Sequence, residues 1–163
     1  MSSRRSVPSY NRDPQPSRWL AVLRIYTGCW FLWLGVSKIL NGFISNFPHL
    51  IIEYANRPLF VFYQSFLTNV VTPNAQVFAI TIVVVEILIG LLLILGFLNR
   101  LTTLIALVLT VNYFLALAKD GMIFLALTLT GIIVVLVLLG SAAGRVWGMD
   151  ASLYRRTLFK YFT

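Results

Sequence analysis

The sequence predicts an all-α protein, a transmembrane four-helix bundle with an interfacial helical segment in its first extracytoplasmic loop. Composition is the first of three observations that support this prediction. Of 163 residues, 59% are hydrophobic and only 11% are charged, whereas an average soluble domain carries roughly 25% charged residues. A soluble chain this short leaves much of its surface in water and could not cover so much apolar area. We therefore expect lipid to be its solvent.

The second observation is a set of four apolar runs, each near the length of about 20 residues that crosses the hydrocarbon core of a bilayer. They cover residues 19–40, 77–98, 101–118 and 122–141. The connections 99–100 and 119–121 are very short, so the neighbouring helices should form antiparallel hairpins. Together the runs define a bundle domain over residues 19–141.

The two ends of the chain are polar and basic. Residues 1–18 are rich in Ser and Pro, which is typical of a flexible tail. Residues 142–163 form a second basic segment. The apolar run 19–40 is longer than a signal-peptide core and is not followed by a small-residue cleavage site, so we expect it to remain as the first span.

The third observation is the distribution of Lys and Arg, which indicates orientation. With a cytoplasmic N-terminus, ten basic residues lie on the cytoplasmic side: Arg4, Arg5, Arg12, Arg18, Arg24, Arg100, Arg145, Arg155, Arg156 and Lys160. Three lie on the other side: Lys38, Arg57 and Lys119. This positive-inside bias predicts that both termini are cytoplasmic. The net charge of +8 therefore indicates lipid headgroups and not nucleic acid, because the basic residues do not form a face interleaved with aromatics.

The long outer connection, residues 41–76, is the one elaborate loop. Asn46 followed by Pro48 predicts a helix that begins there, with proline in its first turn. Residues 59–71 are too short to span the bilayer. As a helix this segment places four apolar residues on one face: Phe60, Tyr63, Leu67 and Val70. It could lie at the membrane interface as a lid, or simply cap the bundle.

Charged and small residues share stripes on two of the spans. Intervals of three and four residues place one set on a single face of the first span: Arg24, Gly28, Phe31, Gly35 and Lys38. The second span repeats the pattern with Glu86, Gly90, Leu93, Phe97 and Arg100. Glycines at such spacings let helix backbones approach closely, and charged stripes should face the bundle interior.

Glu86 is the candidate catalytic or proton-handling residue. It lies roughly 18 Å from the cytoplasmic end of its span, close to the midplane. Asn112, Thr128 and Thr130 are expected at the same depth, with Tyr113 adjacent, so the sequence predicts a midplane polar cluster. An unpaired carboxylate in hydrocarbon is costly, so Glu86 should be protonated or paired with Lys38 or Arg24. Two interpretations remain open: interhelical packing, or a ligand or proton site.

No metal centre is expected from this chain, because it has one cysteine, Cys29, and one histidine, His49. Cys29 is expected to be an inert apolar filler. His49 precedes Glu53 by four residues and is expected to pair with it on a helix surface, with pigment ligation as the weaker alternative. Any quinone or pigment would be held at an interface with another chain. The residues that could contact it are Glu86, Asn112, Tyr113, Thr128, Trp30 and Lys38.

The aromatic side chains of the first span have two interpretations. They are Tyr26, Trp30, Phe31 and Trp33. Packing within the membrane, or anchoring at its surface, is the simpler one. Alternatively, a flat quinone or chlorin ring could lie against them.

Three segments resemble the DoxX family of small four-span bacterial membrane proteins. They read R-IYTG-CWFLWLG-VSK-ILNGF in the first span, E-ILIG-LLLILGFLNR in the second, and G-SAAGRVWGMD after the fourth. The resemblance covers nearly everything from Arg24 to Asp150. The matching positions are Arg24, Gly28, Gly35, Lys38, Gly42, Glu86, Gly90, Gly96, Arg100, Gly144, Arg145 and Asp150. It implies a multi-pass protein of the bacterial cytoplasmic (inner) membrane.

Three alternative functions stay open. The first is a non-catalytic accessory subunit of a larger respiratory or photosynthetic redox complex, with other membrane subunits as partners. The small size, the lack of a redox centre built by the chain and the basic tail favour it, and the resemblance adds that some relatives are subunits of thiosulfate:quinone oxidoreductases. The second is a self-sufficient quinone-linked oxidoreductase, and the third is a carrier of a small lipophilic solute. Relatives with thiol-redox activity use cysteine pairs. The single Cys29 argues against that activity.

Overall fold

The computed structural model describes residues 18–57 and 60–141, and within these ranges the chain is helical with no strand. Its elements are α1 (Arg18–Leu40), α2 (Phe43–Asn56), α3 (Val61–Phe66), the π-helical η1 (Leu67–Val71), the 3₁₀ turn η2 (Thr72–Asn74), α4 (Ala75–Leu95), α5 (Asn99–Leu117) and α6 (Met122–Gly140). Among the described residues, four helical stretches are long and apolar enough to cross a membrane. They are α1, α5, α6 and the stretch Val61–Leu95, whose last part is α4. The predicted all-α membrane-bundle fold is confirmed.

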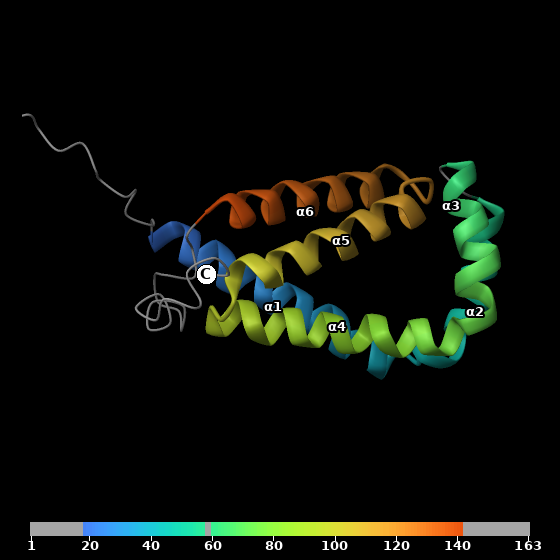
Figure 1. The fold of residues 1–163 in the computed structure, drawn as a ribbon, viewed down its shortest axis with the longest axis horizontal. Helices are drawn as coiled ribbons and strands as arrows, with labels where there is room; N and C mark the ends of the chain where they lie inside the picture. The colour runs from blue at the N-terminus through green and yellow to red at the C-terminus, as the bar shows by residue number, and fades with distance from the viewer. Residues whose placement is uncertain (1–17, 58–59, 142–163) are drawn as a thin grey trace, which may run out of the picture.

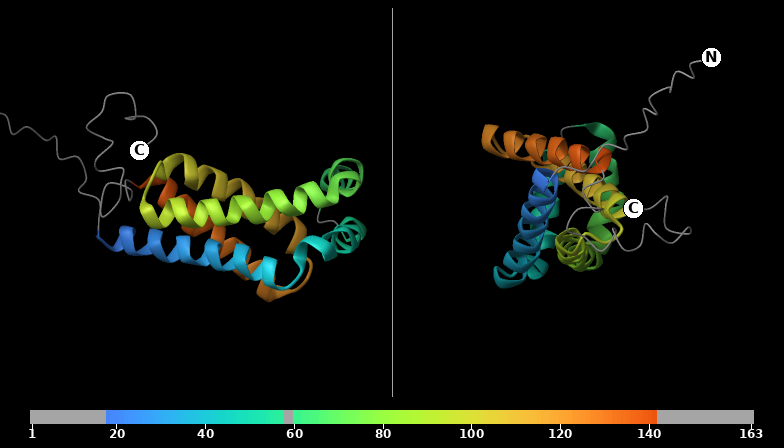
Figure 2. Two further views of the ribbon diagram at one scale, coloured as in Figure 1. Left: turned by 90° about the horizontal axis from the view of Figure 1, so that it is seen from below. Right: turned by 90° about the vertical axis from the view of Figure 1, so that its left-hand side faces the viewer.

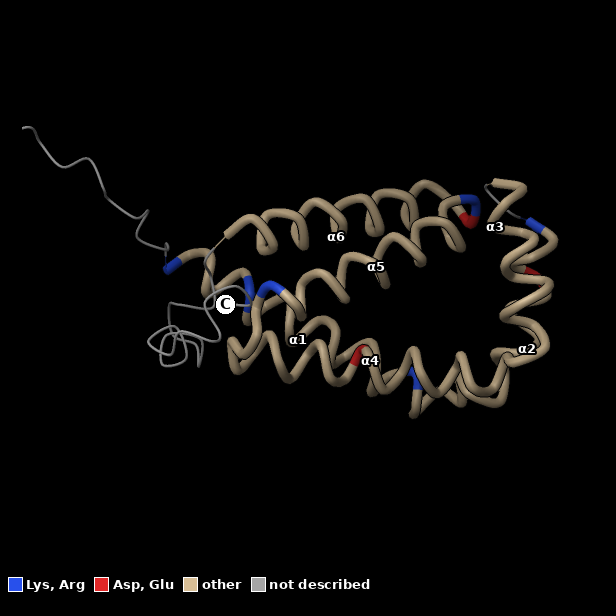
Figure 3. The backbone as a smooth tube through the Cα atoms, viewed as in Figure 1, with Lys and Arg blue, Asp and Glu red and all other residues tan. Residues whose placement is uncertain are grey.

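The four long helices run side by side, and the short helices α2 and α3 lie across one end of the bundle (Figure 1). The most extensive packing joins α1 to α4, and α5 packs chiefly against α6. Figure 2 shows both pairs from two further directions. We call the two ends the α2–α3 end and the α4–α5 end. Figure 3 shows that charged residues are sparse along the helices and gather mostly toward these ends.

Small residues allow the close packing of α1 on α4. A Cβ atom added at Gly90 would lie 2.7 Å from the backbone N of Leu32 and 2.9 Å from the carbonyl O of Gly28. A Cβ atom added at Gly28 would lie 2.9 Å from the carbonyl O of Gly90. All three distances are shorter than a real Cβ contact, so only glycine permits this approach. The close backbone contact expected from the two stripes is therefore confirmed.

The α2–α3 end has its own apolar core, which includes the first two turns of α4. Its buried members are Phe47, Ile51, Ala55, Tyr63, Leu67, Val71, Ala75 and Ala79. Because α4 contributes Ala75 and Ala79 to this core, its N-terminal turns extend beyond the part that packs on α1. The short helices are thus an integral cap on the bundle.

Two predictions for the outer connection are wrong in detail. Helix α2 begins at Phe43 and not near Asn46, because Gly42 adopts a left-handed conformation (φ 66°) and its carbonyl accepts a hydrogen bond from the Asn46 N–H at 3.2 Å. Pro48 therefore lies inside the helix, where it cannot donate to the carbonyl of Ile44.

The face predicted for residues 59–71 also differs from the buried one. Tyr63 and Leu67 are buried as expected, but Val71 takes the place of Val70, and Phe60 is exposed. The π-helical stretch η1 explains the shift, since its wider turn changes which side chains share a face. Leu59 lies outside the described residues, as do the predicted tail before Arg18 and the segment 142–163 with Arg145 and Asp150.

Candidate functional site

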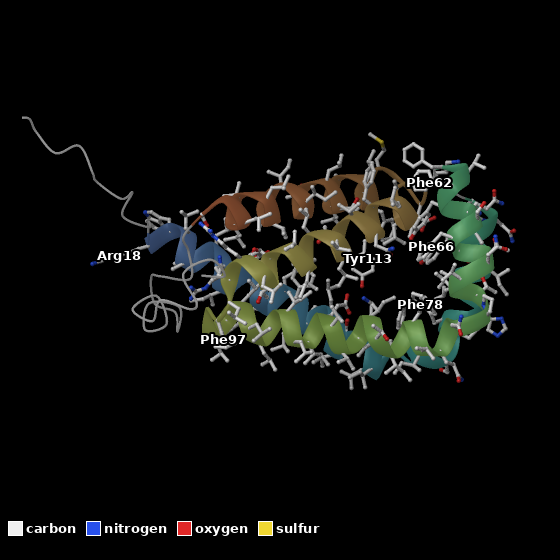
Figure 4. All side chains as sticks on the ribbon, in the orientation of Figure 1. Arg18, Phe62, Phe66, Phe78, Phe97 and Tyr113 are labelled. Carbon is white, nitrogen blue, oxygen red and sulfur yellow. The ribbon has the colours of Figure 1, made fainter. Side chains whose placement is uncertain are left out.

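Three side chains from three different spans meet inside the bundle: Lys38 of α1, Glu86 of α4 and Tyr113 of α5. Lys38 donates hydrogen bonds to Oε1 of Glu86 and, at 2.6 Å, to the hydroxyl of Tyr113. The Tyr113 hydroxyl in turn donates to the same Glu86 oxygen. Tyr113 lies between α5 and α4 (Figure 4). We call these three residues the triad.

The triad is electrically balanced and almost fully removed from solvent. The Glu86 side chain is 0% exposed and that of Lys38 is 17% exposed. A charge buried in the bundle needs a partner of opposite sign, and each of these two residues supplies it for the other. Of the two cations considered for Glu86, Lys38 is the one that the structure joins to it.

The second carboxylate oxygen of Glu86 differs from the first. Oε2 is buried and accepts no hydrogen bond among the described residues, whereas Oε1 accepts two. A carboxylate oxygen can accept more than one hydrogen bond. Oε2 is therefore the atom of the triad that is able to take a proton or to accept a hydrogen bond from a bound molecule.

Aromatic rings surround the Lys38 ammonium group. It lies 4.7 Å from the ring centroid of Tyr113 and 5.2 Å from that of Phe43, which is the first residue of α2. Both distances fit favourable cation–π contacts. Tyr63 of α3 donates a hydrogen bond from its hydroxyl to the Asn112 carbonyl at 3.4 Å. The cap thus contacts the triad on one side and the backbone next to Tyr113 on the other.

A cavity of about 250 Å³ opens beside the triad at the junction of α1 and α2. Its lining residues are Ser37, Lys38, Asn41, Phe43, Asn46 and Leu50. Lys38 belongs to both the cavity and the triad, and it is the triad residue that lines the cavity. The side chains of Ser37 and Asn41 donate to carbonyls of their own helix.

The predicted midplane depth of Glu86 stays a prediction, because the structure fixes its level against the neighbouring helices and not against a bilayer. A Cβ atom on Gly35 would lie 3.3 Å from the Cβ of Glu86, so the two residues are level, and α1 ends only five residues later at Leu40. Glu86 thus lies about 7 Å from that end of α1, while α4 continues about 9 Å further into the cap.

The membership of the predicted polar cluster is only partly right. Tyr113 joins Glu86, but Thr128 donates to the Phe124 carbonyl of its own helix at 2.8 Å, and Asn112 contributes a backbone carbonyl to Tyr63. Helix α6 packs mainly against α5, which keeps its threonines away from α4, and Thr130 is exposed. None of these three side chains is hydrogen-bonded to Glu86.

Other candidate residues lie apart from the triad. Arg24 is fully buried nearer the α4–α5 end, and Arg100 is exposed there. Trp30 is exposed on the outside of α1 together with Tyr26 and Trp33, whereas Phe31 is in the core. The aromatic side chains of this span therefore divide between bundle packing and the outer surface.

The predicted pair of His49 with Glu53 is not formed. His49 is exposed, and the Glu53 carboxylate instead pairs with Arg57, four residues further along α2, at 3.4 Å. Arg57 is at the end of the helix and is free to turn back onto the preceding turn. Among residues 18–57 and 60–141, no group of three or more His, Cys, Asp or Glu side chains is placed to hold a metal ion.

Phe43 is the site residue that the sequence reasoning missed. The Asn41-Gly42 pair was the available signal, because Gly42 in a left-handed conformation turns the chain directly after α1. That turn brings the first ring of α2 over the last turn of α1. Residue spacing within one helix could not predict this contact, because Phe43 and Lys38 belong to different helices on either side of the turn at Gly42.

Comparison with known proteins adds one finding. The family model DoxX matches residues 19–119 of this chain, a range that includes all three residues of the triad. No curated protein and no solved structure matches the chain.

Proposed function

The chain belongs to the DoxX family, and from this premise we propose that it is a non-catalytic accessory subunit of a membrane redox complex. In this role the triad of Lys38, Glu86 and Tyr113 holds and exchanges a proton within the membrane. Electron transfer belongs to the partner subunits. We also propose that the membrane is the bacterial cytoplasmic membrane, with both termini in the cytoplasm.

The observation that carries the proposal is the acid–base character of the triad. Ionisable residues inside spans are costly, and where they occur they mark substrate, ion or proton paths. A buried ion pair adds little net stability compared with a well-packed apolar pair. Stability alone is therefore a weak reason to keep Lys38 and Glu86 at this position, and proton exchange supplies a stronger one.

The redox assignment rests on the chemistry that such a site can serve. Reduction of a lipid-soluble quinone to the quinol takes up two electrons and two protons, so a redox complex in a membrane needs groups that move protons there. Glu86 can accept a proton at Oε2 while Lys38 and Tyr113 hold Oε1 in place. Helix positions fix all three residues, as precise proton transfer requires.

Gentle purification tests the assembly part of the proposal. The native protein, carrying a C-terminal tag, should be extracted with mild detergent and examined for co-purifying proteins, quinones and pigments. Recovery in a fixed ratio with a redox complex is the expected result. Recovery of the chain alone, with the redox activity of the membranes unchanged when the protein is absent, would refute an accessory role.

The Glu86→Gln variant tests the proton part, because glutamine keeps the shape of the side chain and removes the titrating group. Assembly with the complex should persist, while the proton-coupled activity of the complex falls. Thr81→Val serves as a control in the same helix, since Thr81 is exposed and its hydroxyl bonds only to the Val77 carbonyl. If Glu86→Gln and Thr81→Val both retain full activity, the triad has no proton role.

The cavity beside Lys38 favours a second candidate, a self-sufficient quinone-linked oxidoreductase. Its volume of about 250 Å³ would admit a single substituted ring, with Phe43 and Lys38 among the residues of its wall. Purified chain should then oxidise thiosulfate or another donor with a soluble quinone. Absence of turnover with several donors would leave the accessory role as the sole proposal.

A further inference from the structure

The two sides of the triad differ in what separates them from water. Toward the α2–α3 end, Lys38 lies two residues from the end of α1 and lines the open cavity. Two side chains with amide groups, Asn41 and Asn46, line the same cavity, and Asn41 is exposed. Lys38 is therefore the triad residue next to an opening whose wall includes polar side chains.

Toward the α4–α5 end, a packed apolar core separates the triad from a region where polar residues are also buried, among them Arg24, Asn99, Thr102 and Thr103. The buried members of this core are Phe31, Ile89, Leu93, Ala106 and Val135. Glu86 lies nine residues before the end of α4 at Leu95, so about 14 Å of helix separates the carboxylate from that end. The contact between Gly28 and Gly90 joins α1 and α4 at the backbone over part of this length.

From this asymmetry we propose that the triad exchanges its proton with the aqueous phase at the α2–α3 end only, through the cavity beside Lys38. The inference rests on the proposed proton role and adds its direction. A proton that enters from the cavity adds to Oε2 of Glu86, which becomes a neutral carboxyl group, and Lys38 keeps its own proton. The group gains one positive charge, and release of the same proton restores the neutral ion pair.

The surroundings of Lys38 suit this transient charge. Once Glu86 is neutral, the ammonium group still lies 4.7 and 5.2 Å from the ring centroids of Tyr113 and Phe43. Cation–π contacts of this kind are worth about 0.5–2 kcal/mol. The ammonium group also keeps its hydrogen bond to the Tyr113 hydroxyl.

Few titratable groups face the triad from the elements around it. Within the described residues, α1 contributes Lys38 and α5 contributes Tyr113, both already in the triad. Tyr63 of α3 bonds to the carbonyl that precedes Tyr113 in sequence. Helix α2 presents the uncharged Phe43 ring. The proton on Glu86 is thus governed by the triad itself.

Thiol labelling from one side of a sealed vesicle tests the access route. The natural thiol is removed by Cys29→Ala, and single cysteines are then placed by substitution. Two exposed reference positions define the sides: Asn56→Cys at the α2–α3 end and Arg100→Cys at the α4–α5 end. A membrane-impermeant charged maleimide is added to one side at a time.

Ser37→Cys and Asn41→Cys in the cavity wall should react only from the side that labels Asn56→Cys. Leu93→Cys in the apolar core is the matched buried control and should react from neither side. The inference is overturned if either cavity cysteine reacts from the side that labels Arg100→Cys, or if neither cavity cysteine reacts from any side. It is also overturned if Leu93→Cys reacts from the Arg100 side.

A second measurement follows the proton directly. Infrared difference spectra of vesicles sorted by orientation, assigned with Glu86→Gln, report the carboxyl band of Glu86 after a pH step on one side. The band should respond at once to the α2–α3 side, and to the other side only after a protonophore is added. An equal response from both sides would refute one-sided exchange. No Glu86 response at all, with normal labelling of the cavity, would refute the proton role and leave the access route standing.

Discussion

Replacing Lys38 with methionine should destabilise the bundle more than any other single change in the triad. Methionine is similar in length to the lysine stem, so the packing of α1 on α4 stays nearly the same. The change removes the ammonium group and leaves the Glu86 carboxylate, which is 0% exposed, with Tyr113 as its one donor. Removing one partner of a buried ion pair costs about 3–5 kcal/mol.

The opposite change, Glu86→Gln, should cost less. The Lys38 side chain is 17% exposed and the residue lines an open cavity, and its ammonium group keeps its contacts with the rings of Phe43 and Tyr113. The glutamine oxygen can still accept a hydrogen bond. We expect a loss of about 1–3 kcal/mol, the usual range for a weakened hydrogen bond to a charged group.

The double variant Lys38→Met/Glu86→Gln separates the charge effect from packing. It contains no unpaired charge, so it should be more stable than Lys38→Met alone. The interaction energy between the two changes should fall within about 0.5–3 kcal/mol. Thermal unfolding in mild detergent, together with titration by a denaturing detergent, measures the four proteins of this cycle. If Lys38→Met is as stable as the unmodified protein, or if Glu86→Gln is the more damaging change, the burial asymmetry does not govern this site.

Three further changes test other parts of the structure. Gly90→Ala should lower stability by about 1–3 kcal/mol, because the new methyl forces α1 and α4 apart. The control Gly140→Ala meets no atom within 4 Å and should be nearly neutral, so equal melting temperatures of the two variants would contradict this. Tyr113→Phe removes one donor to Glu86 and should cost about 1–3 kcal/mol by the same denaturation assay, and an unchanged midpoint would argue against that bond. Burial raises the pKa of Tyr54, which lies in α2 outside the spans. Ultraviolet titration should therefore show one tyrosine that ionises above the ordinary value of about 10, and this signal should be missing in Tyr54→Phe. Since the folded state holds that proton more tightly, stability should fall as pH rises above this ordinary value, and a transition for Tyr54 at or below it would refute the burial argument.

The close approach of α1 and α4 was predictable from the sequence, because it depends on spacing within each helix. Gly28 and Lys38 share a stripe with Gly35 whatever the neighbours are, and the same holds for Glu86 and Gly90. Two such stripes with small residues and opposite charges favour packing on each other. The structure joins them in that way.

Two features were not predictable in the same way: the level of Glu86 against α1, and the lack of any hydrogen bond to it from the described residues of α6. Apolar composition does not distinguish the turns of α4 that pack on α1 from the turns that pack into the cap with Tyr63 and Leu67. Likewise, two residues on different helices do not come into contact merely because each lies equally far from the end of its own helix. Thr128 belongs to a helix that packs on α5 and bonds within its own backbone.

The sequence by itself determined that lipid is the solvent and how many long helices the protein has. Backbone polar groups in lipid must bond within their own segment, so an apolar run of this length has one stable state, the helix. It also determined which residues share a helix face. Only the tertiary structure decided which cation meets Glu86, that Tyr113 completes the pair, and that Phe43 covers Lys38. These contacts depend on the register and rotation of one helix against another, and on the turn at Gly42, which are set by packing across the whole bundle and not by any local run of residues.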